Sequence, residues 1–277
     1  MDPSDFTSVF LHNDISRFIF LNGIDLRNFY HNPTYKSQIL QSYYKNLKTL
    51  FPNGDIWVPT FNYSYCDKGV YNIQTSPSQV GVFSEFFRLS IAEWRTSVPI
   101  FSIAGIGVCP LGEPLQPIID PFGRESMFAK LVSRRGALVN YDVHFSPTFI
   151  HYIERIHNDG PLYRYDKYFC GEIINNNSSE FVKLIYHVIP KGLKIVYDTN
   201  KVLQDLLENG IANLLPKGAG FLVDVEQMVR FCLAKLDDDP FYFLETECVP
   251  RVRAELDRTG RRFKIDDFLD SHRSFHP

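Results

Sequence analysis

Strand-like apolar runs alternate with helix-like segments through the first half of the chain, and this alternation constrains the fold most strongly. Strands are predicted at 16–21, 56–61, 99–108 and 136–140, and helices at 35–50, 80–89 and 124–134. The helical periodicity is clearest in 35–50, where apolar residues recur at intervals of three and four. Strands that alternate with helices in this way are typical of α/β proteins.

The second half has a different texture. Short strand-like pieces at 172–174, 182–188 and 193–198 are followed by amphipathic helices at 201–210 and 225–236. No internal repeat or low-complexity linker divides the chain. We therefore expect a single large α/β domain over residues 1–250, with a mixed sheet flanked by helices. Residues 251–277 form a charged C-terminal extension in which basic residues are interleaved with Asp and Glu, as on a solvated helix.

Composition excludes several classes of protein. With 277 residues, 44% of them hydrophobic, the chain can bury a core without metal or disulfide staples. A net charge of −3 gives no general attraction to nucleic acid. No apolar run approaches the roughly 20 residues of a membrane span, and the polar start Met1-Asp-Pro-Ser-Asp is unlike a secretory signal. Five scattered cysteines without a CxxC pair indicate free thiols and a cytoplasmic location.

Several familiar catalytic motifs are absent. The sequence has no GxGxxG after the first strand, no Walker A loop, no GxSxG elbow and no HExxH. Of His144, His151, Glu154 and His157, only the last three could share one helix as metal ligands. No Cys-containing or flanking carboxylate pattern supports such a site. We therefore predict no metal.

A His-containing segment follows the strand at 136–140. Thr148, His151 and Glu154 recur every three residues, so on a helix they share one face. Histidine is the side chain best suited to proton transfer near neutral pH. Taken alone, however, a single histidine near an apolar segment is more often a structural residue.

A carboxylate partner for His151 would come from the helix at 80–89. Glu85 lies there among Val, Phe and Leu residues. It belongs either to the polar face of an amphipathic helix or to a buried site, where it would need a partner such as a His proton.

Taken in order, six segments of the chain resemble the aminoglycoside 3-N-acetyltransferase family of antibiotic N-acetyltransferases. They are Val58-Pro-Thr-Phe61 with Tyr63-Ser-Tyr-Cys66, Asn72 to Gly81 leading to Glu85 and Phe87-Arg88, Arg95 to Pro99 with Ser102 to Gly107, Pro121-Phe-Gly123 with Ser126 and Leu131, Thr148-x-x-His151-x-x-Glu154, and Asp239-Pro240 with Phe243-Leu244. The fifth is similar to the family motif T-x-L-H-x-x-E. No single segment is specific, but their fixed order over residues 18–244 is.

The resemblance implies an antibiotic N-acetyltransferase-like α/β fold, distinct from the GNAT fold, and direct acyl transfer from acetyl-CoA or another acyl-CoA to an amine. It implies that His151 is the general base, that Glu85 orients it and that Thr148 supports the oxyanion. It also implies that the cofactor is bound by three further groups. These are the loop Gly23-Ile24-Asp25-Leu26, Ser102 and the turn Pro121-Phe122-Gly123.

Two positions depart from the family pattern. Members often carry His-Ser-Ser-Leu or His-Ser-Asp-Leu where we align Gly23-Ile24-Asp25-Leu26, and His-Pro-x-His-Ser where this chain has Val98-Pro99-Ile-Phe101-Ser102. Loss of two imidazoles favours an acceptor less cationic than an aminoglycoside.

We therefore expect an N-acetyltransferase acting on an amino sugar, with a nucleotide-linked sugar for surface polysaccharide as the expected acceptor. The alternatives are an aminoglycoside 3-N-acetyltransferase that confers antibiotic resistance and an idle binding protein with the same fold. The expected partner is a small-molecule amine, with no nucleic acid and no membrane span. The sequence leaves open whether the protein forms a homodimer.

Overall fold

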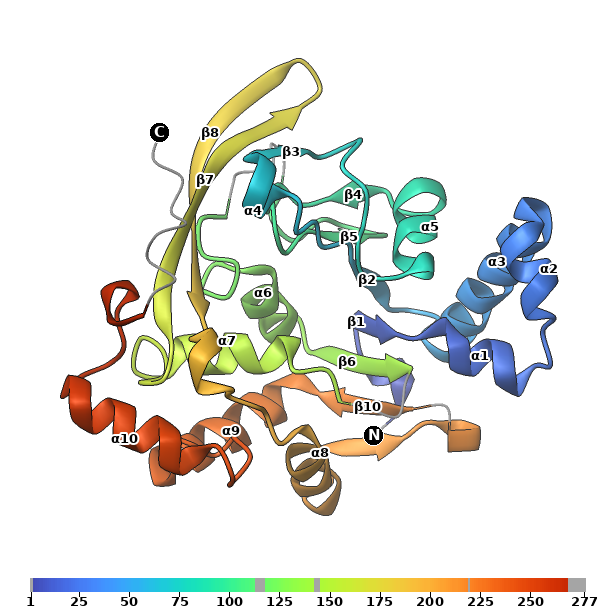
Figure 1. The fold of residues 1–277 in the computed structure, drawn as a ribbon. Helices are drawn as coiled ribbons and strands as arrows, with labels where there is room; N and C mark the ends of the chain where they lie inside the picture. The colour runs from blue at the N-terminus through green and yellow to red at the C-terminus, as the bar shows by residue number, and fades with distance from the viewer. Residues whose placement is uncertain (1, 113–117, 142–144, 219, 269–277) are drawn as a thin grey trace.

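A seven-stranded mixed sheet organises the molecule (Figure 1). The computed structural model describes residues 2–112, 118–141, 145–218 and 220–268. The strand order is β4-β5-β2-β1-β6-β10-β9. The bounds are β1 (Ser8–Asn13), β2 (Asp55–Pro59), β4 (Trp94–Arg95), β5 (Ile103–Gly105), β6 (Gly136–Tyr141), β9 (Ala212–Leu214) and β10 (Phe221–Asp224). The central strand β1 runs parallel to β2 and β6, and the outer pairs are antiparallel.

A second, three-stranded sheet stands beside the first. Its order is β3-β7-β8, with β3 (Val70–Asn72), β7 (Tyr165–Asn175) and β8 (Ser178–Val188). The long β7–β8 ribbon runs down one side of the molecule (Figure 1). Gly171 of β7 lies so close to Gly69 that a Cβ atom there would be 2.1 Å from the Gly69 carbonyl oxygen. The short helix α4 (Tyr65–Lys68) can therefore dock on β7.

Helices cover both faces of the large sheet. On one side lie α1 (Ile15–Leu21), α2 (Leu26–His31), α3 (Pro33–Leu50) and α5 (Val82–Ser90), and on the other α6 (Met127–Ser133), α7 (Thr148–Ile156), α8 (Thr199–Glu208) and α9 (Val225–Asp238). Strand β1 shows why two cores form. Val9 and Leu11 pack into the first helical layer and Phe10 into the second, because alternate strand residues point to opposite faces. The predicted mixed sheet flanked by helices is confirmed.

One predicted strand is wrong. Residues 16–21 form helix α1, and the first strand is β1. Asp14 caps α1 by accepting a hydrogen bond from the Ser16 amide. The apolar run Phe18-Ile-Phe therefore belongs to a helix, in which Phe18 and Ile19 are buried and Phe20 is 82% exposed.

Other boundaries also move. The run predicted as a strand at 99–108 contains only the three-residue β5, and 193–198 contributes a single β-bridge at Tyr197. The piece predicted at 172–174 is the end of the longer strand β7, and the remaining predicted strands and helices match observed elements within a few residues.

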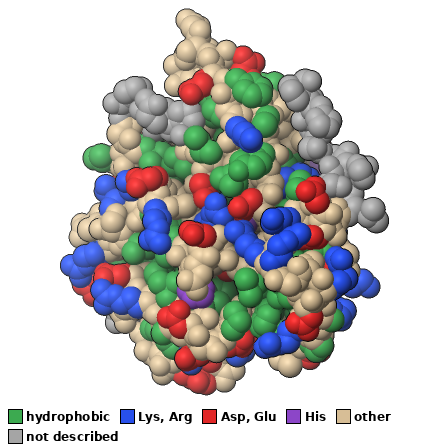
Figure 2. All heavy atoms as spheres, turned by 90° about the vertical axis from the view of Figure 1, so that its left-hand side faces the viewer, with side chains coloured by type: hydrophobic (Ala, Val, Ile, Leu, Met, Phe, Trp, Pro, Cys, Tyr) green, Lys and Arg blue, Asp and Glu red, His purple; other side chains and the backbone are tan. Residues whose placement is uncertain are grey.

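The C-terminal segment continues the fold up to residue 268. Helix α10 (Val249–Thr259) spans the expected boundary at residue 250, and Val252 and Phe263 are buried in a third cluster with Tyr163 and Tyr165. Arg262 forms a salt bridge with Asp166 of β7 at 3.1 Å. Lys and Arg side chains interspersed with Asp and Glu mark this side of the molecule (Figure 2). No helix in the described ranges is long and apolar enough to cross a membrane.

His12, whose Nε2 atom is buried, predicts acid sensitivity. Burial lowers the pKa of His12, at the end of β1, from 6.5 to about 4. As the pH falls from 6.5 toward 4, the unfolded chain binds a proton that the folded chain does not, so stability present above pH 6.5 is lost. The expected slope is about 1.4 kcal/mol per pH unit for each such group. Urea unfolding between pH 7 and 5 measures it, and His12→Asn should flatten the slope. An unchanged slope in that variant would contradict the assignment.

Candidate active site around His151

Helix α7 carries the predicted His-containing segment. Thr148 is its first residue, and His151 and Glu154 follow at successive turns. The Glu154 side chain is fully buried, and the His151 side chain is 14% exposed. His151 Nδ1 lies 3.5 Å from Glu154 Oε2. The predicted shared face is therefore present for these two residues.

Glu154 is the centre of a buried polar cluster. Its carboxylate accepts hydrogen bonds from the Tyr163 hydroxyl at 2.5 Å and from the Tyr197 hydroxyl at 2.7 and 2.8 Å. Arg164 Nε lies 3.0 Å from Oε2 in a buried ion pair. Burial raises the pKa of Glu154, but Arg164, His151 and a further histidine, His187, outweigh it and hold that pKa well below its usual range. The carboxylate is therefore ionised.

Two groups meet at His151 Nδ1. Arg164 Nη2 lies 3.1 Å away and can only donate, whereas Glu154 Oε2 can only accept. When the proton is on Nδ1, the imidazole donates it toward Glu154, and the Nε2 lone pair can accept a proton from the substrate. In the other tautomer Nδ1 accepts a hydrogen bond from Arg164, and Nε2–H is a donor. Burial, and then Arg164, lowers the pKa of His151 against the opposing effect of Glu154. The imidazole is therefore neutral near pH 7.

Aromatic rings enclose His151. Phe122 stands edge-on to the imidazole with ring centroids 5.4 Å apart, and Tyr186 of β8 lies at 6.2 Å. Phe122 is fully buried and stacks on Phe128 of α6. The turn Pro121-Phe122-Gly123, predicted to bind cofactor, thus supplies a wall of the His151 site.

The structure does not bring Glu85 to His151. Both carboxylate oxygens of Glu85 bind Arg88, at 2.8 and 2.6 Å, and Oε2 also accepts the Ser78 amide at 2.7 Å. The orienting role predicted for Glu85 is therefore corrected: the carboxylate next to His151 is Glu154, three residues along the same helix.

The loop predicted to bind the cofactor also does not lie beside α7. Gly23, Ile24, Asp25 and Leu26 join α1 to α2, across the molecule from α7 (Figure 1). There Asp25 caps α2, and Leu26 is 54% exposed. The segment that ends the first strand and leads into α1 is His12-Asn13-Asp14-Ile15. Its letters match the family's His-Ser-Asp-Leu pattern better, which is the signal that would have found it.

Ser102 and Thr148 have local partners. The buried Ser102 hydroxyl donates to the Thr60 carbonyl at 2.6 Å and accepts from buried Arg95 at 3.1 Å. Thr148 Oγ1 lies 3.2 Å from Ser146 Oγ at the N-terminus of α7, one turn before His151. Val98 and Phe101, the departures from His-Pro-x-His-Ser, are core residues, and Phe101 packs on Phe122 and Tyr186.

The histidines considered as metal ligands in the sequence do not lie together in the structure. His157 Nε2 contacts Asp237 at 3.0 Å, and His144 lies outside the described residues. A different trio converges, because ligand atoms of His151, Glu154 and His187 lie within 4.8 Å of one another. A cation there would face the Arg164 guanidinium, which already neutralises Glu154. The cluster fits an ion-pair network better than a metal centre.

Sequence reasoning missed Arg164, His187, Tyr163 and Tyr197. Tyr163 and Arg164 lie between α7 and β7, His187 lies on β8, and Tyr197 lies just before α8. No motif marks them. Their positions follow only from the packing of the ribbon against α7.

The family comparison agrees with this fold. The family model described as aminoglycoside 3-N-acetyltransferase matches residues 41–237. The chain therefore belongs to the aminoglycoside 3-N-acetyltransferase family, and the predicted N-acetyltransferase class is confirmed. No curated protein sequence matches the chain significantly.

Solved structures share the fold at low identity. Aminoglycoside acetyltransferase AAC(3)-Xa is 17% identical, with a TM-score of 0.63 over 84% of this chain and 87% of that chain. AAC-IIIb in a binary complex with CoASH is 17% identical, with a TM-score of 0.64 over 84% and 90%. A His-to-Ala mutant of AAC(3)-IVa in complex with apramycin is 18% identical, with a TM-score of 0.60 over 86% and 88%.

Proposed function

We propose that this protein transfers an acetyl group from acetyl-CoA to the amine of a small sugar-like acceptor, with His151 as general base. The observation that carries the proposal is the placement of His151 at the rim of a buried cluster. Its Nδ1 meets an ionised carboxylate, and aromatic rings shield the imidazole. Family membership supplies the reaction class.

The proposed step is a direct transfer. His151 Nε2 accepts a proton from the acceptor amine as the amine nitrogen bonds to the thioester carbonyl carbon. The C–S bond then breaks and the CoA thiolate leaves. Glu154 stabilises the imidazolium through Nδ1–H, and Thr148, at the N-terminus of α7, supports the oxyanion. No covalent enzyme intermediate is needed.

The donor fits at the carboxyl ends of the parallel strands. β1 and β6 end side by side, with His12 paired in register to Asn140 and Asn13 to Tyr141. Open α/β sheets bind ligands at such strand ends. The buried His12 Nε2 has no hydrogen-bond partner among the described residues, so a polar group of a ligand would satisfy it. This region replaces Gly23 to Leu26 in the proposal.

The acceptor class has two candidates. The core positions of Val98 and Phe101, behind Phe122 and Tyr186, support an amino sugar of lower charge, such as a nucleotide-linked precursor of a surface polysaccharide. The apramycin complex of AAC(3)-IVa supports an aminoglycoside acceptor and a role in antibiotic resistance. Thiol release from acetyl-CoA, measured across a panel of amino sugars and aminoglycosides, decides between them. A complete lack of release with every acceptor would favour the idle binding protein.

A pH–rate profile tests the base. Because burial and Arg164 lower the pKa of His151 below 6.5, the neutral and active form should persist into mildly acidic solution. The acid limb of kcat/KM should therefore have its midpoint below pH 6.5. A midpoint above that value would contradict His151 as base.

A further inference from the structure

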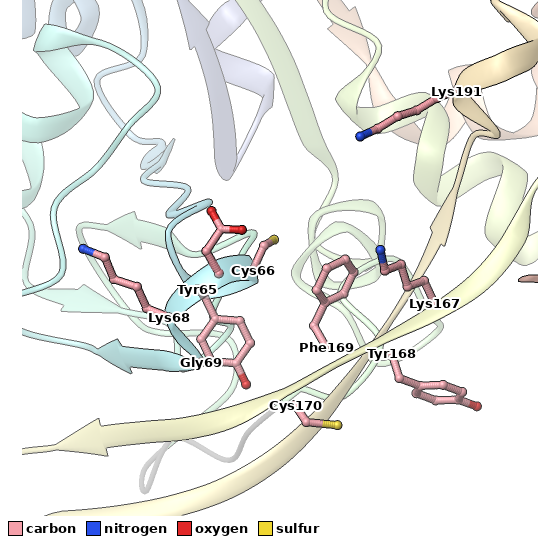
Figure 3. Close-up of a pocket in the computed structure, with 10 residues that line it drawn as sticks. Tyr65, Cys66, Lys68, Gly69, Lys167, Tyr168, Phe169, Cys170 and Lys191 are labelled. Atoms are coloured by element: carbon pink, nitrogen blue, oxygen red, sulfur yellow. The ribbon is translucent and has the colours of Figure 1, made fainter. Parts of the chain in front are cut away.

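A cavity of about 590 Å³ lies between α4 and β7 (Figure 3). Lys167 and Phe169 point from β7 toward the side where Cys66 of α4 lies, and the Lys191 side chain extends into the same space, whereas Tyr168 and Cys170 point away. This alternation is that of a β-strand. The cavity is therefore open to one face of the β7–β8 ribbon.

Its charge is predominantly positive. The lining contains Lys68, Lys167 and Lys191 against a single carboxylate, Asp67. Within the described ranges, none of the three lysines forms a salt bridge, and the Lys167 ammonium lies 5.4 Å from the centroid of the Phe169 ring. Lys68 extends away from the cavity, so Lys167 and Lys191 supply its inward charge (Figure 3). Unpaired cations around a concavity attract anions.

The cavity adjoins the His151 site. Lys167 is the register partner of Tyr186 across the antiparallel β7–β8 ladder. Side chains directly opposite each other on such a ladder lie on the same face, with Cβ atoms roughly 5 Å apart. Tyr186 in turn packs its ring against the His151 imidazole. A ligand held by Lys167 is thus one side chain away from the ring that covers His151.

The thiol of Cys66 in this cavity does not suggest covalent chemistry. Burial, and then Asp67, raises the pKa of Cys66 to about 11. The Cys66 side chain is therefore a protonated thiol near neutral pH and a weak nucleophile. Tyr65, which also lines the cavity, has a buried hydroxyl without a hydrogen-bond partner among the described residues. These features favour binding through hydrogen bonds and charge.

We propose that this cavity binds a phosphate group carried by the acceptor, through Lys167 and Lys191, while the acceptor amine reaches His151. The proposal rests on the proposed acetyl transfer and narrows its substrate to a phosphate-bearing amino sugar. A polycationic aminoglycoside would meet repulsion from the same lysines. Phosphates also occur in CoA, but the carboxyl ends of β1 and β6 point away from α4 and β7 (Figure 1).

Calorimetry with the full chain and CoASH tests the binding. The probes are glucosamine 6-phosphate and a nucleoside-diphosphate-linked amino sugar, each compared with its unphosphorylated sugar. Lys167→Gln should weaken binding of the phosphorylated sugars roughly tenfold and leave the others unchanged. Lys183→Gln is the matched control, because Lys183 lies on the adjacent strand over the Tyr168 ring and outside the cavity.

Three outcomes would overturn the proposal. They are equal affinity for the phosphorylated and unphosphorylated sugars, equal effects of Lys167→Gln and Lys183→Gln, and weakened binding of CoASH alone, which would assign the lysines to the donor. Transfer kinetics separate this proposal from the function itself. If an unphosphorylated amine is acetylated at a rate that does not depend on Lys167, the proposed acetyl transfer is supported and the proposed phosphate site is contradicted. If no acceptor is acetylated, the proposed acetyl transfer is contradicted, and calorimetry still shows whether the cavity binds a phosphate group.

Discussion

Replacing His151 with alanine is expected to slow acetyl transfer by roughly 10²–10⁴-fold, the contribution of a positioned general base. The change removes the imidazole that faces Glu154 and Arg164 and leaves Phe122 and Tyr186 in place. Thiol release from acetyl-CoA with a saturating acceptor measures the effect. The KM for the donor should change little, because the lost contact acts on the transferred proton.

His157→Ala is the control for this experiment. His157 follows α7 directly, and its imidazole contacts Asp237 instead of the Glu154 cluster. It should retain wild-type turnover. Equal rates for wild type and His151→Ala on every active acceptor would show that the base lies elsewhere.

The sequence predicted the fold class well because hydrophobic periodicity reports burial directly. It failed at residues 16–21, since an apolar run of six residues is compatible with either a strand or a helix. The capping residue Asp14 was the missing local signal. A strand predicted at the position of α1 puts the segment after the first strand at Gly23, eleven residues beyond His12.

The site was predictable only within α7. His151 and Glu154 are neighbours because a helix places residues three apart on one face, which sequence spacing reveals. The remaining partners come from the connection between α7 and β7, from β8 and from the segment before α8. Arg164 and Tyr197 meet Glu154 through tertiary packing, and no local pattern encodes that meeting. The family resemblance assigns the orienting role to Glu85, but Arg88 pairs with that carboxylate within its own helix.

Glu154→Gln should lower the free energy of unfolding by about 3–5 kcal/mol, the cost of leaving one partner of a buried ion pair uncompensated. Arg164 is 1% exposed and would keep its charge beside a neutral amide. Urea unfolding at pH 7 measures the loss. Because the same carboxylate stabilises the imidazolium, transfer should also slow and its dependence on pH should change.

Glu85→Gln is the comparison that separates the two carboxylates. Its side chain is 30% exposed, and its partner Arg88, although only 7% exposed, keeps its hydrogen bond to the Gln74 carbonyl, so we expect a smaller loss of stability than for Glu154→Gln and near-normal turnover. The double variant Glu154→Gln/Arg164→Gln removes the stranded charge and should recover part of the stability without recovering activity. If Glu85→Gln abolishes transfer while Glu154→Gln preserves it, the carboxylate that supports His151 lies on α5 after all, and the cluster around Glu154 serves only to hold β7 and β8 against α7.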